Sequence, residues 1–340
     1  MSTQPLVGGS AEPLVTRYDC ALLDLDGVLY VGPDAVPGAP EAVAAARAAG
    51  MRVAFVTNNA SRTPETVAAH LTALGMVAAA GDVVTSAQAA AALVSAAVPP
   101  GSAVLVVGGD GLGAALVERG LRPVNSLAEG PAAVVQGFSP DVGWRLLAEG
   151  TYAVRAGLPW IASNLDVTVP TARGLAPGNG ALVGVIAAAT GQWPIAAGKP
   201  ETPLYEEAVR RTGARHPIVV GDRLDTDIEG ANRASTPSLL VLTGVTTAAD
   251  LVLAQPPLRP TYVAVDIRTG LLEPHPPVLR HPHHSWSCAG WVCAVGEGGI
   301  RLTGDGAPLD GLRAMCVASW DALSAPVSDH VREAAARLGL

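Results

Sequence analysis

Two aspartates separated by one residue stand at the end of a short apolar segment near the start of the chain. Asp24 lies near the end of the segment Cys20–Leu25, and Asp26 directly follows it. The largely apolar residues of this segment predict a buried strand of a parallel sheet. Residues two apart in an extended backbone point to the same side, so the two carboxylates are expected to be neighbours. Neighbouring carboxylates repel each other unless a cation lies between them or one of them takes a proton. The pair therefore predicts a metal site or a paired acid and base.

A lysine is the next residue whose side chain could take part in a reaction. Among the 22 lysines and arginines of the chain, Lys199 is the single lysine. Its ammonium group is a compact charge that approaches a phosphate or a carboxylate differently from a planar guanidinium. It lies just before a helix that Thr202 and Pro203 are predicted to begin, and helix N-termini favour anions. We expect Lys199 to bind an anionic group.

Polar residues also follow two other apolar strands. Their side chains carry hydroxyl, amide or carboxylate oxygens: Thr57, Asn58 and Asn59 after residues 52–56, and Asp222 and Asp227 after residues 216–220. Ligands of open parallel sheets bind beyond the carboxyl ends of the strands, so these groups are expected to share one crevice with the aspartate pair. Oxygen ligands supplemented by water suit Mg²⁺. A metal, an acidic pair, a lysine and neutral donors are together what an anionic phosphoryl group requires.

The residue types predict a division of roles. Asp24 is the expected nucleophile, which attacks phosphorus and forms an aspartyl phosphate. Asp26 is expected to protonate the leaving alkoxide and then to deprotonate the hydrolytic water. Mg²⁺ is expected on Asp24, Asp222 and the backbone carbonyl of Asp26, where it cancels charge. Lys199 would stabilise the transferring group, and Asp227 would contact Lys199 or order metal-bound water from behind the ligands.

Strand and helix patterns alternate along most of the chain and then stop. The alternation predicts a doubly wound parallel-sheet core of α/β class at residues 14–80 and 192–270, with an inserted α/β cap at 81–191. A proline-rich linker at 273–284 is followed by a hairpin pattern and by a helix from about Leu309. Residues 271–340 are therefore predicted to form a small ββα-like α+β appendage.

Charge and composition exclude several classes of protein. The formal net charge of −8 disfavours a nucleic-acid partner, and no apolar run reaches the 18 residues of a membrane span. The start of the chain has no positively charged segment of the kind that begins a secretory signal, so a cytoplasmic location is expected. Four cysteines are too few and too scattered for a disulfide framework: Cys20, Cys288, Cys293 and Cys316.

Four segments, in chain order, resemble the four motifs of the haloacid dehalogenase superfamily: DLDGVLY, TNN, GKP and GDRLDTDIEGA. The resemblance covers about residues 15–270. Its matching positions are those already singled out: Asp24, Asp26, Thr57, Asn58, Asn59, Lys199, Asp222 and Asp227. A large cap between the second and third motifs is the arrangement of the subgroup that contains nucleotide, pyridoxal-phosphate and glycerol-phosphate phosphatases. The resemblance implies an Mg²⁺-dependent phosphomonoester hydrolase with glycerol 3-phosphate as the first-choice substrate, and it leaves a homodimer open.

Other functions stay open at this point. The substrate could be 2-phosphoglycolate, pyridoxal phosphate, a nucleotide or a sugar phosphate, although Val169 stands where pyridoxal-phosphate phosphatases carry a histidine. An acceptor alcohol in place of water would make the chain a phosphotransferase. A receiver-like phosphoacceptor module also uses an aspartate, Mg²⁺ and a lysine, but Asp26 and the large cap argue against it. The appendage could also serve in binding or assembly.

Three more segments have both a functional and a structural interpretation. The loop Ser163–Gly180 is predicted to be a substrate lid, and the resemblance implies that Asn164 and Asp166 contact the substrate. The segment GGDGLGAAL at residues 108–116 imitates a dinucleotide-binding loop, but a tight turn is favoured because its glycine spacing is irregular. His281, His283 and His284 with Cys288 and Cys293 do not have the spacing of a zinc finger, which favours a solvated linker and core cysteines.

Overall fold

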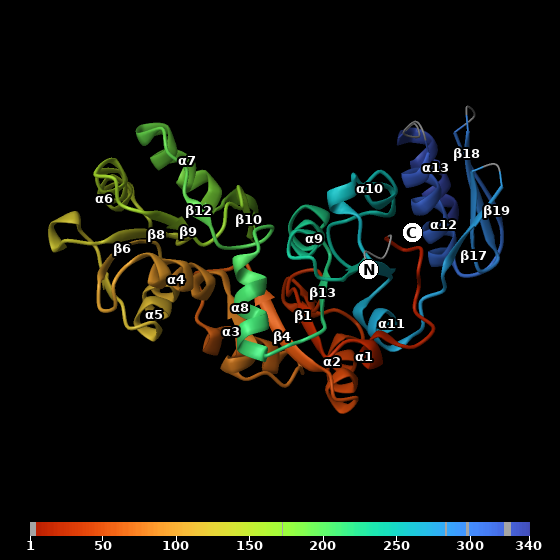
Figure 1. Cartoon of the computed structure of the whole chain (residues 1–340), viewed down its shortest axis with the longest axis horizontal. Helices are drawn as coiled ribbons and strands as arrows, with labels where there is room; N and C mark the ends of the chain where they lie inside the picture. The colour runs from red at the N-terminus through yellow and green to blue at the C-terminus, as the bar shows by residue number, and fades with distance from the viewer. Residues whose placement is uncertain (1–4, 172, 283, 297–298, 323–327) are drawn as a thin grey trace. The chain divides into compact units, whose positions relative to one another are not determined.

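The computed structural model describes residues 5–171, 173–282, 284–296, 299–322 and 328–340 (Figure 1). Its backbone divides into two compact units. One, which we call the aspartate unit, comprises Met1–Ala54, Leu74–Met76 and Thr212–Leu340, and the other, the lysine unit, comprises Phe55–Ala73 and Val77–Arg211. Strand β4 (Arg52–Thr57) passes from the first unit into the second. The domain boundaries given above stay a prediction.

The aspartate unit is built on parallel strands in the order β15-β14-β13-β1. Their bounds are Cys20–Leu23 for β1, Pro217–Gly221 for β13, Ser238–Val241 for β14 and Tyr262–Ala264 for β15. Nearly every residue of these strands is buried, as expected for a parallel sheet that is covered on both faces. The start of β4 joins the other side of β1, where the Arg52 N–H donates to the Asp19 carbonyl at 3.0 Å.

Short helices and a small hairpin complete this sheet region. The helices are α1 (Leu14–Arg17), α2 (Ala39–Ala48), α9 (Glu229–Arg233), α10 (Ala248–Val252) and α11 (Ile267–Leu272), with one turn of π-helix, η3 (Leu224–Ile228), and one 3-10 turn, η4 (Pro256–Leu258). The hairpin strands are β2 (Tyr30–Val31) and β3 (Asp34–Ala35).

The C-terminal part of the aspartate unit is a four-stranded antiparallel meander with two helices. Its elements are β16 (Val278–His281), β17 (Ser285–Cys288), β18 (Trp291–Gly296), β19 (Gly299–Gly304), α12 (Pro308–Asp321) and α13 (Ser328–Leu338). Two strands were expected, and the difference has two causes. The proline-rich linker supplies β16, and the expected strand 286–295 is divided where Ala289 takes a positive φ of 46°, so the chain reverses between β17 and β18.

This appendage shares one apolar core with the parallel sheet of its unit. Leu312 and Met315 of α12 belong to the same buried cluster as Leu240 of β14, Leu251 of α10 and Val263 of β15. The Arg313 guanidinium also donates to the Val263 carbonyl at 2.9 Å, which satisfies a polar group on the outermost strand of the parallel sheet. The appendage is therefore packed as part of the unit and not as a separate body within it.

The lysine unit contains a five-stranded parallel sheet in the order β12-β9-β8-β6-β7. The strands are β6 (Ala103–Val107), β7 (Arg122–Val124), β8 (Ala133–Gln136), β9 (Trp160–Ala162) and β12 (Ile195–Ala196). The end of β4 pairs in parallel with β5 (Val83–Thr85), and β10 (Thr168–Thr171) forms a hairpin with β11 (Gly174–Pro177) inside the loop Ser163–Gly180.

Helices connect the strands of the lysine unit, as the crossovers of a parallel sheet require. They are α3 (Pro64–Ala73), α4 (Ser86–Ala97), α5 (Asp110–Glu118), α6 (Trp144–Arg155) and α7 (Asn179–Thr190), with 3-10 turns η1 (Ala80–Asp82) and η2 (Leu127–Glu129). Helix α8 (Pro203–Thr212) follows β12 and leads to β13. None of the helices in the described ranges has both the length and the apolar character needed to cross a membrane. The predicted α/β fold class with a small α+β appendage is confirmed.

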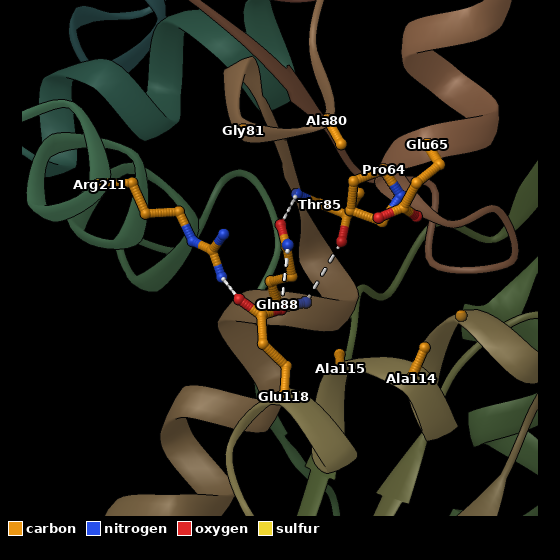
Figure 2. A pocket seen from close by; sticks show the side chains of 11 residues that line it. Pro64, Glu65, Ala80, Gly81, Thr85, Gln88, Ala114, Ala115, Glu118 and Arg211 are labelled. Atoms are coloured by element: carbon orange, nitrogen blue, oxygen red, sulfur yellow. Dashed lines mark hydrogen bonds and ion pairs between the residues drawn. The ribbon is translucent and has the colours of Figure 1, made fainter.

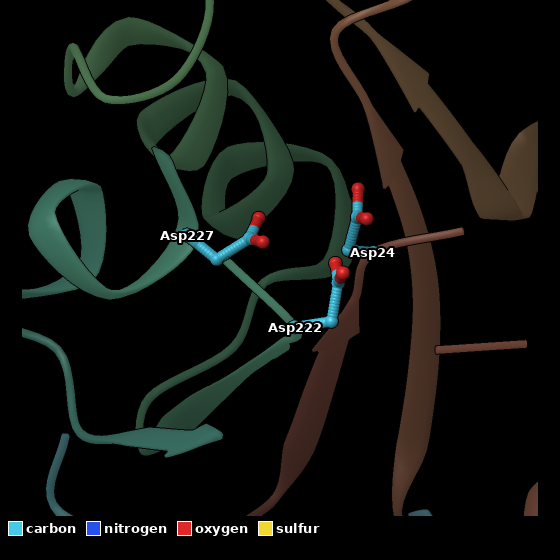
Figure 3. A group of neighbouring side chains, drawn as sticks. All are labelled: Asp24, Asp222 and Asp227. Carbon is cyan, nitrogen blue, oxygen red and sulfur yellow. The ribbon is translucent and has the colours of Figure 1, made fainter. Parts of the chain in front are cut away.

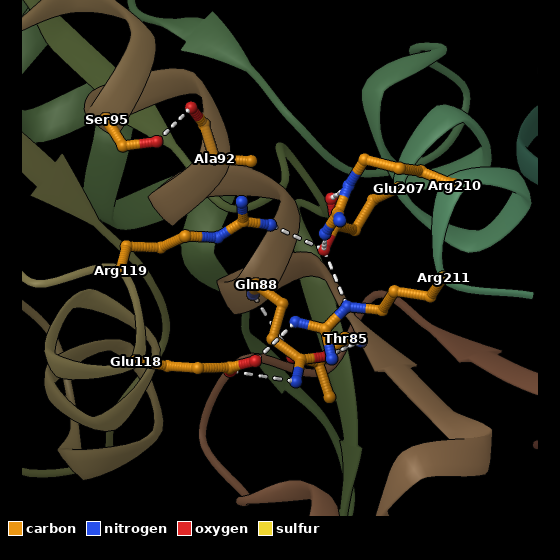
Figure 4. A network of polar contacts seen from close by, with 9 residues as sticks. All are labelled: Thr85, Gln88, Ala92, Ser95, Glu118, Arg119, Glu207, Arg210 and Arg211. Carbon is orange, nitrogen blue, oxygen red and sulfur yellow. Dashed lines mark hydrogen bonds and ion pairs between the residues drawn. The ribbon is translucent and has the colours of Figure 1, made fainter.

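A buried carboxylate ties two helices of the lysine unit together (Figure 4). Glu207 of α8 receives hydrogen bonds from Arg119 at 2.7 Å, from Arg210 at 2.6 Å and from Arg211 at 2.6 Å. Arg211 also reaches Glu118 at the end of α5, at 2.8 Å. Burial raises the pKa of the Glu207 carboxyl, but the bonds from Arg210 and Arg211 and the charge of Arg119 outweigh burial and hold the pKa below its usual 4.5. Charge balance thus fixes α8 beside α5.

Candidate active site

Three carboxylates converge just beyond the ends of two neighbouring strands of the aspartate unit (Figure 3). Asp24 directly follows β1, and its N–H donates to the Val220 carbonyl of β13 at 2.9 Å. Asp222 directly follows β13, and Asp227 comes from η3. One carboxylate oxygen of each lies within 4.8 Å of the others. We call Asp24, Asp222 and Asp227 the aspartate cluster.

Asp222 is held in place by two glycines and a loop. A Cβ at Gly27 would lie 2.5 Å from its Oδ2, and one at Gly244 would lie 2.0 Å away. Only glycine leaves room for the carboxylate at these positions. The Val245 N–H donates to the same oxygen at 2.7 Å, and the Thr243 hydroxyl donates to the Gly27 carbonyl.

Sequence reasoning missed this loop of Thr243–Thr246. The signal was present, because Thr243 and Gly244 follow the apolar strand β14 in the same way that the other site residues follow theirs.

Asp227 lies against the backbone that leads to Asp222. The Arg223 N–H donates to its Oδ2 at 3.2 Å, and a Cβ at Gly221 would lie 2.2 Å from the Asp227 Cβ. Asp225, in the same motif, faces away: its exposed carboxylate pairs with the Arg223 guanidinium at 2.8 Å. The third carboxylate of the cluster is therefore Asp227, which had been expected only behind the ligands.

Asp26 is oriented by a tight turn and not by a strand. Strand β1 ends at Leu23, and the Leu25 carbonyl accepts from the N–H groups of Val28 and Leu29 at 3.3 and 2.9 Å. A turn at Leu25 therefore replaces the extended geometry assumed for the pair, and Asp26 is exposed and not part of the aspartate cluster. The Tyr30 hydroxyl donates to its Oδ2 at 3.4 Å.

The donor set of the aspartate cluster fits a hard divalent cation. Asp222 and Asp227 are almost fully buried, and bringing three carboxylates so close is unfavourable unless a cation or protons offset the repulsion. Within the described ranges this is the one group of three or more histidine, cysteine or acidic side chains whose ligand atoms converge in this way. Carboxylate oxygens with water in the remaining positions are the usual environment of Mg²⁺.

The lysine unit contains the other predicted residues. Lys199 is buried between β12 and α8, and its Nζ lies 3.5 Å from the Val56 carbonyl. The buried Thr57 hydroxyl accepts from the Asn59 N–H at 3.0 Å. The Asn59 Oδ1 accepts from the N–H and the hydroxyl of Ser61, both at 2.8 Å, so this side chain begins the turn before α3.

Both predicted loop residues meet Asn58. The Asn164 Nδ2 donates to the Asn58 carbonyl at 2.7 Å, and the Asn58 Nδ2 donates to the Asp166 carboxylate at 3.2 Å. The Asn58 side chain also bonds the backbone of Lys199. The loop, the second motif and the lysine thus form one connected group inside the lysine unit.

The glycine-rich segment at 108–116 serves packing. A Cβ at Gly111 would lie 2.4 Å from the Ala60 carbonyl, and one at Gly108 would lie 2.9 Å from the Gly137 carbonyl. The backbone of α5 is therefore pressed against its neighbours with no space for a pyrophosphate.

The zinc interpretation finds no support in the described residues. His283 lies outside them, and the His281 Nε2 is 2.6 Å from the Ser287 hydroxyl. Burial raises the pKa of the Cys288 and Cys293 thiols to about 12, which disfavours the thiolate that a metal would bind.

A cavity of about 320 Å³ in the lysine unit is lined by residues of α3, α4, α5 and α8 (Figure 2). Its polar side chains bond to one another. Gln88 and Thr85 form a reciprocal cap of α4, and Glu118 forms an ion pair with Arg211. We assign it no role in the chemistry.

Comparison with known proteins agrees with this geometry. A model of the haloacid dehalogenase-like hydrolases matches residues 21–122, and a second model of HAD-hydrolase-like proteins matches residues 196–269. D-glycerol 3-phosphate phosphatase of Mycobacterium tuberculosis is 46% identical over 320 residues, which cover 92% of this chain and 89% of that protein. The chain belongs to the haloacid dehalogenase-like hydrolases. The predicted family and hydrolase class are confirmed.

Two further comparisons extend the relationship of this hydrolase. The crystal structure of the mycobacterial glycerol phosphate phosphatase in complex with magnesium aligns with a TM-score of 0.86 at 43% identity, covering 96% of this chain and 99% of that one. An acid sugar phosphatase of Staphylococcus aureus is 38% identical over 259 residues, which cover 76% of this chain and 98% of that protein.

A third family model covers the end of the hydrolase. The GCN5-related N-acetyltransferase like domain matches residues 288–340, which lie in the appendage. None of the four motifs of the hydrolase superfamily lies in this segment.

Proposed function

We propose that this chain is an Mg²⁺-dependent phosphatase that hydrolyses D-glycerol 3-phosphate through an aspartyl phosphate on Asp24. The observation that carries the chemistry is the convergence of Asp24, Asp222 and Asp227 at adjacent strand ends. The substrate comes from the mycobacterial relative, which is 46% identical and is named for that activity.

The residues present suit a magnesium ion. Asp24 and Asp222 would hold it together with the backbone carbonyl of Asp26, and Asp227 would order the ligands from beside them. When bound, Mg²⁺ supplies positive charge that allows an anionic carboxylate to approach an anionic phosphate. The relative's structure in complex with magnesium supports this choice of metal.

Two aspartates would carry the two steps. In the first, an Asp24 oxygen bonds to phosphorus, the ester P–O bond breaks, and the Asp26 carboxylic acid gives its proton to the leaving glycerol oxygen. In the second, the Asp26 carboxylate takes a proton from water, the water oxygen bonds to phosphorus, and the bond between phosphorus and Asp24 breaks. Inorganic phosphate leaves and Asp24 is restored. The exposure of Asp26 suits a group that exchanges protons with both the leaving group and water.

The residues of the lysine unit would bind the substrate. Lys199 would stabilise charge on the phosphoryl oxygens, and Thr57 would donate a hydrogen bond to one of them. Asn59, Asn164 and Asp166 would serve binding, with the last two acting through the loop Ser163–Gly180. Asn58 would serve binding through the backbone of Lys199, which its side chain holds. Closure of that loop would exclude water until the aspartyl phosphate has formed.

We also propose a cytoplasmic enzyme without nucleic-acid or membrane partners. The net charge of −8 supports the exclusion of nucleic-acid partners. A homodimer stays open.

The test is phosphate release from a panel of esters with Mg²⁺. The panel holds both enantiomers of glycerol 3-phosphate, 2-phosphoglycolate, pyridoxal phosphate, sugar phosphates and nucleoside monophosphates. The variant Asp24→Asn tests the nucleophile, and Asp225→Asn makes the same change on an exposed carboxylate of the fourth motif outside the cluster. We expect preference for the D-enantiomer, loss of turnover in Asp24→Asn and retention in Asp225→Asn.

Other outcomes would redirect the proposal. Turnover of another ester, still lost in Asp24→Asn, would keep the mechanism and replace the substrate. Phosphate release that declines when an acceptor alcohol is added, with a new ester formed, would indicate a transferase. An aspartyl phosphate that persists for seconds without turnover would indicate a phosphoacceptor module.

A further inference from the structure

We propose that Asn58 is a positioning residue, which fixes Lys199 through its backbone and makes that placement depend on the loop Ser163–Gly180. The inference rests on the proposed function in so far as Lys199 is taken as the lysine that contacts the phosphoryl group. It gives Asn58 a role that acts through another residue, in place of direct contact with substrate. All of the contacts that carry it lie inside the lysine unit.

The Asn58 amide holds the lysine backbone from both sides. Its Oδ1 accepts from the Lys199 N–H at 2.8 Å, and its Nδ2 donates to the Lys199 carbonyl at 3.0 Å. Two hydrogen bonds from one planar amide fix the position and the orientation of that peptide segment. Because Lys199 is buried, the path of its side chain follows from where its backbone is held.

The neighbouring glycine shows that this contact is built into the chain. A Cβ at Gly198 would lie 2.5 Å from the Asn58 Oδ1 and 2.6 Å from the Ser163 carbonyl. A side chain at position 198 would therefore push the amide away from the lysine. The GKP motif needs its glycine here for the approach of Asn58.

Asn58 also connects the lysine to the loop. Its Nδ2 lies 3.2 Å from both carboxylate oxygens of Asp166. Its carbonyl accepts from the Asn164 Nδ2 at 2.7 Å and from the Ser86 hydroxyl at 2.6 Å. A shift of the loop at Asp166 therefore acts on the same amide group that holds Lys199.

A second asparagine extends this connection to the far end of the loop. The Asn179 Nδ2 donates to the Asn164 carbonyl at 2.7 Å, and Asn179 is the first residue of α7. Hydrogen bonds therefore run from α7 through Asn164 and Asn58 to Lys199. The loop is therefore anchored both at the residue that holds Lys199 and at the start of the helix that follows.

The chemistry of the amide predicts which substitutions disturb it. Asn58→Asp keeps an acceptor for the Lys199 N–H, but it loses the donor to the Lys199 carbonyl and sets a carboxylate against Asp166. Adding Asp166→Asn returns a donor–acceptor pair between positions 58 and 166 with the roles exchanged. The double variant therefore relieves the repulsion that the single variant creates.

The single lysine permits a direct observation of the positioned group. In protein labelled with ¹³Cε-lysine and made without a lysine-containing tag, the side-chain NMR signal comes from Lys199 alone. We would record this signal and the steady-state kinetics for the wild type, Asn58→Asp, Asp166→Asn, Asn58→Asp with Asp166→Asn, and the exposed control Asn125→Ala.

We expect Asn58→Asp to lower kcat by about 100-fold, the effect of a misplaced catalytic group, with KM changed by less than about threefold. The Lys199 signal should shift, and the double variant should recover about tenfold in kcat and move the signal back. Asp166→Asn should lower kcat by roughly threefold to tenfold, and Asn125→Ala should change neither readout.

Two results would overturn the proposal. One is a rise of KM in Asn58→Asp with kcat and the Lys199 signal unchanged, which would make Asn58 a substrate contact. The other is a double variant no better than Asn58→Asp, which would remove the link to the loop. If Asn58→Asp does not fold, as judged by circular dichroism, the proposal is tested by the kcat and the Lys199 NMR signal of Asp166→Asn. If the wild type hydrolyses no ester, the proposed function fails, and the Lys199 signals alone still test the positioning.

Discussion

Among the described residues, the aspartate cluster and Glu207 differ in what surrounds the carboxylate. In the aspartate cluster, three carboxylates bring their oxygens within 4.8 Å of one another. Around Glu207, one carboxylate meets three guanidinium groups at 2.6 to 2.7 Å. The three carboxylates of the cluster face one another, with the charge of Arg223 acting on two of them, whereas the Glu207 carboxylate is surrounded by positive charge.

The difference separates a site from a structural contact. A carboxylate among arginines is satisfied when the chain folds, and its low pKa reflects interactions that stabilise the fold. Carboxylates that converge repel one another, and a cation bound between them would offset that repulsion. Burial of an acid does not distinguish these cases, whereas the sign of the neighbouring charges does.

The largest expected effect is on turnover. Asp24→Asn should lower kcat by roughly 10⁴-fold to 10⁶-fold, because an amide oxygen does not replace the nucleophilic carboxylate. Phosphate release under saturating substrate and Mg²⁺ measures it. Asp225→Asn is the matched control, and a comparable loss in that control would mean that turnover is sensitive to a lost carboxylate outside the cluster as well.

Glu207→Gln should have the next largest effect, on stability. Removing the carboxylate leaves three arginines without their shared partner, at a cost of about 3 kcal/mol, the lower end for buried pairs because the arginines are partly exposed. Urea unfolding at pH 7 measures the change. Since the folded-state pKa lies below 4.5, the contribution is full above that pH, and the gap between wild type and variant should narrow as the pH falls through the folded-state pKa.

Turnover distinguishes Glu207 further from the cluster. Folded Glu207→Gln should retain kcat within about threefold, because the residue balances charge in the scaffold. A loss of kcat as large as that of Asp24→Asn, in protein that remains folded, would show that Glu207 serves turnover and not only the scaffold.

Magnesium should stabilise the wild type and not a cluster variant. At 100 times its Kd, Mg²⁺ is expected to add about 2.7 kcal/mol to the free energy of unfolding, by mass action. Asp222→Asn removes one carboxylate ligand and should abolish most of that gain. Thermal unfolding with Mg²⁺ and with a chelator measures both, and an equal gain in the two proteins would place the metal elsewhere.

The smallest expected effect has the opposite sign from that of Glu207→Gln. In the presence of a chelator, Asp24→Asn should raise the free energy of unfolding by on the order of 1 kcal/mol, because one of three like charges is removed. Urea unfolding of metal-free protein provides the measurement. A clear destabilisation would show that Asp24 is held by compensating contacts, as Glu207 is.

Sequence reasoning found the parts that depend on local pattern. The apolar strands and the polar residues that follow them predicted where Asp24 and Asp222 stand in the fold, since strand ends are a property of short segments. The helix start at Thr202 and Pro203 predicted where Lys199 stands. The same rule applied to Thr243 would have found the loop that holds Asp222.

Other features depend on contacts between distant segments. The position of Asp227 in the cluster depends on a π-helical turn, which no spacing rule indicated. The charge balance at Glu207 joins Arg119 to residues nearly 90 positions away, and a single sequence does not show which arginines meet which acid. The apolar face of α12 was visible, but its partners in β14 and β15 were not.

The shared core of the appendage and the parallel sheet sets the order in which this protein matures. During synthesis the sheet of the aspartate unit emerges first, while Leu251 and Val263 still lack the covering of α12 and α13. The ribosome needs roughly 3 to 13 seconds to add residues 273–338. Until then the nascent chain leaves this apolar flank of the sheet uncovered, and a chain that lacked α12 and α13 would keep it exposed to solvent.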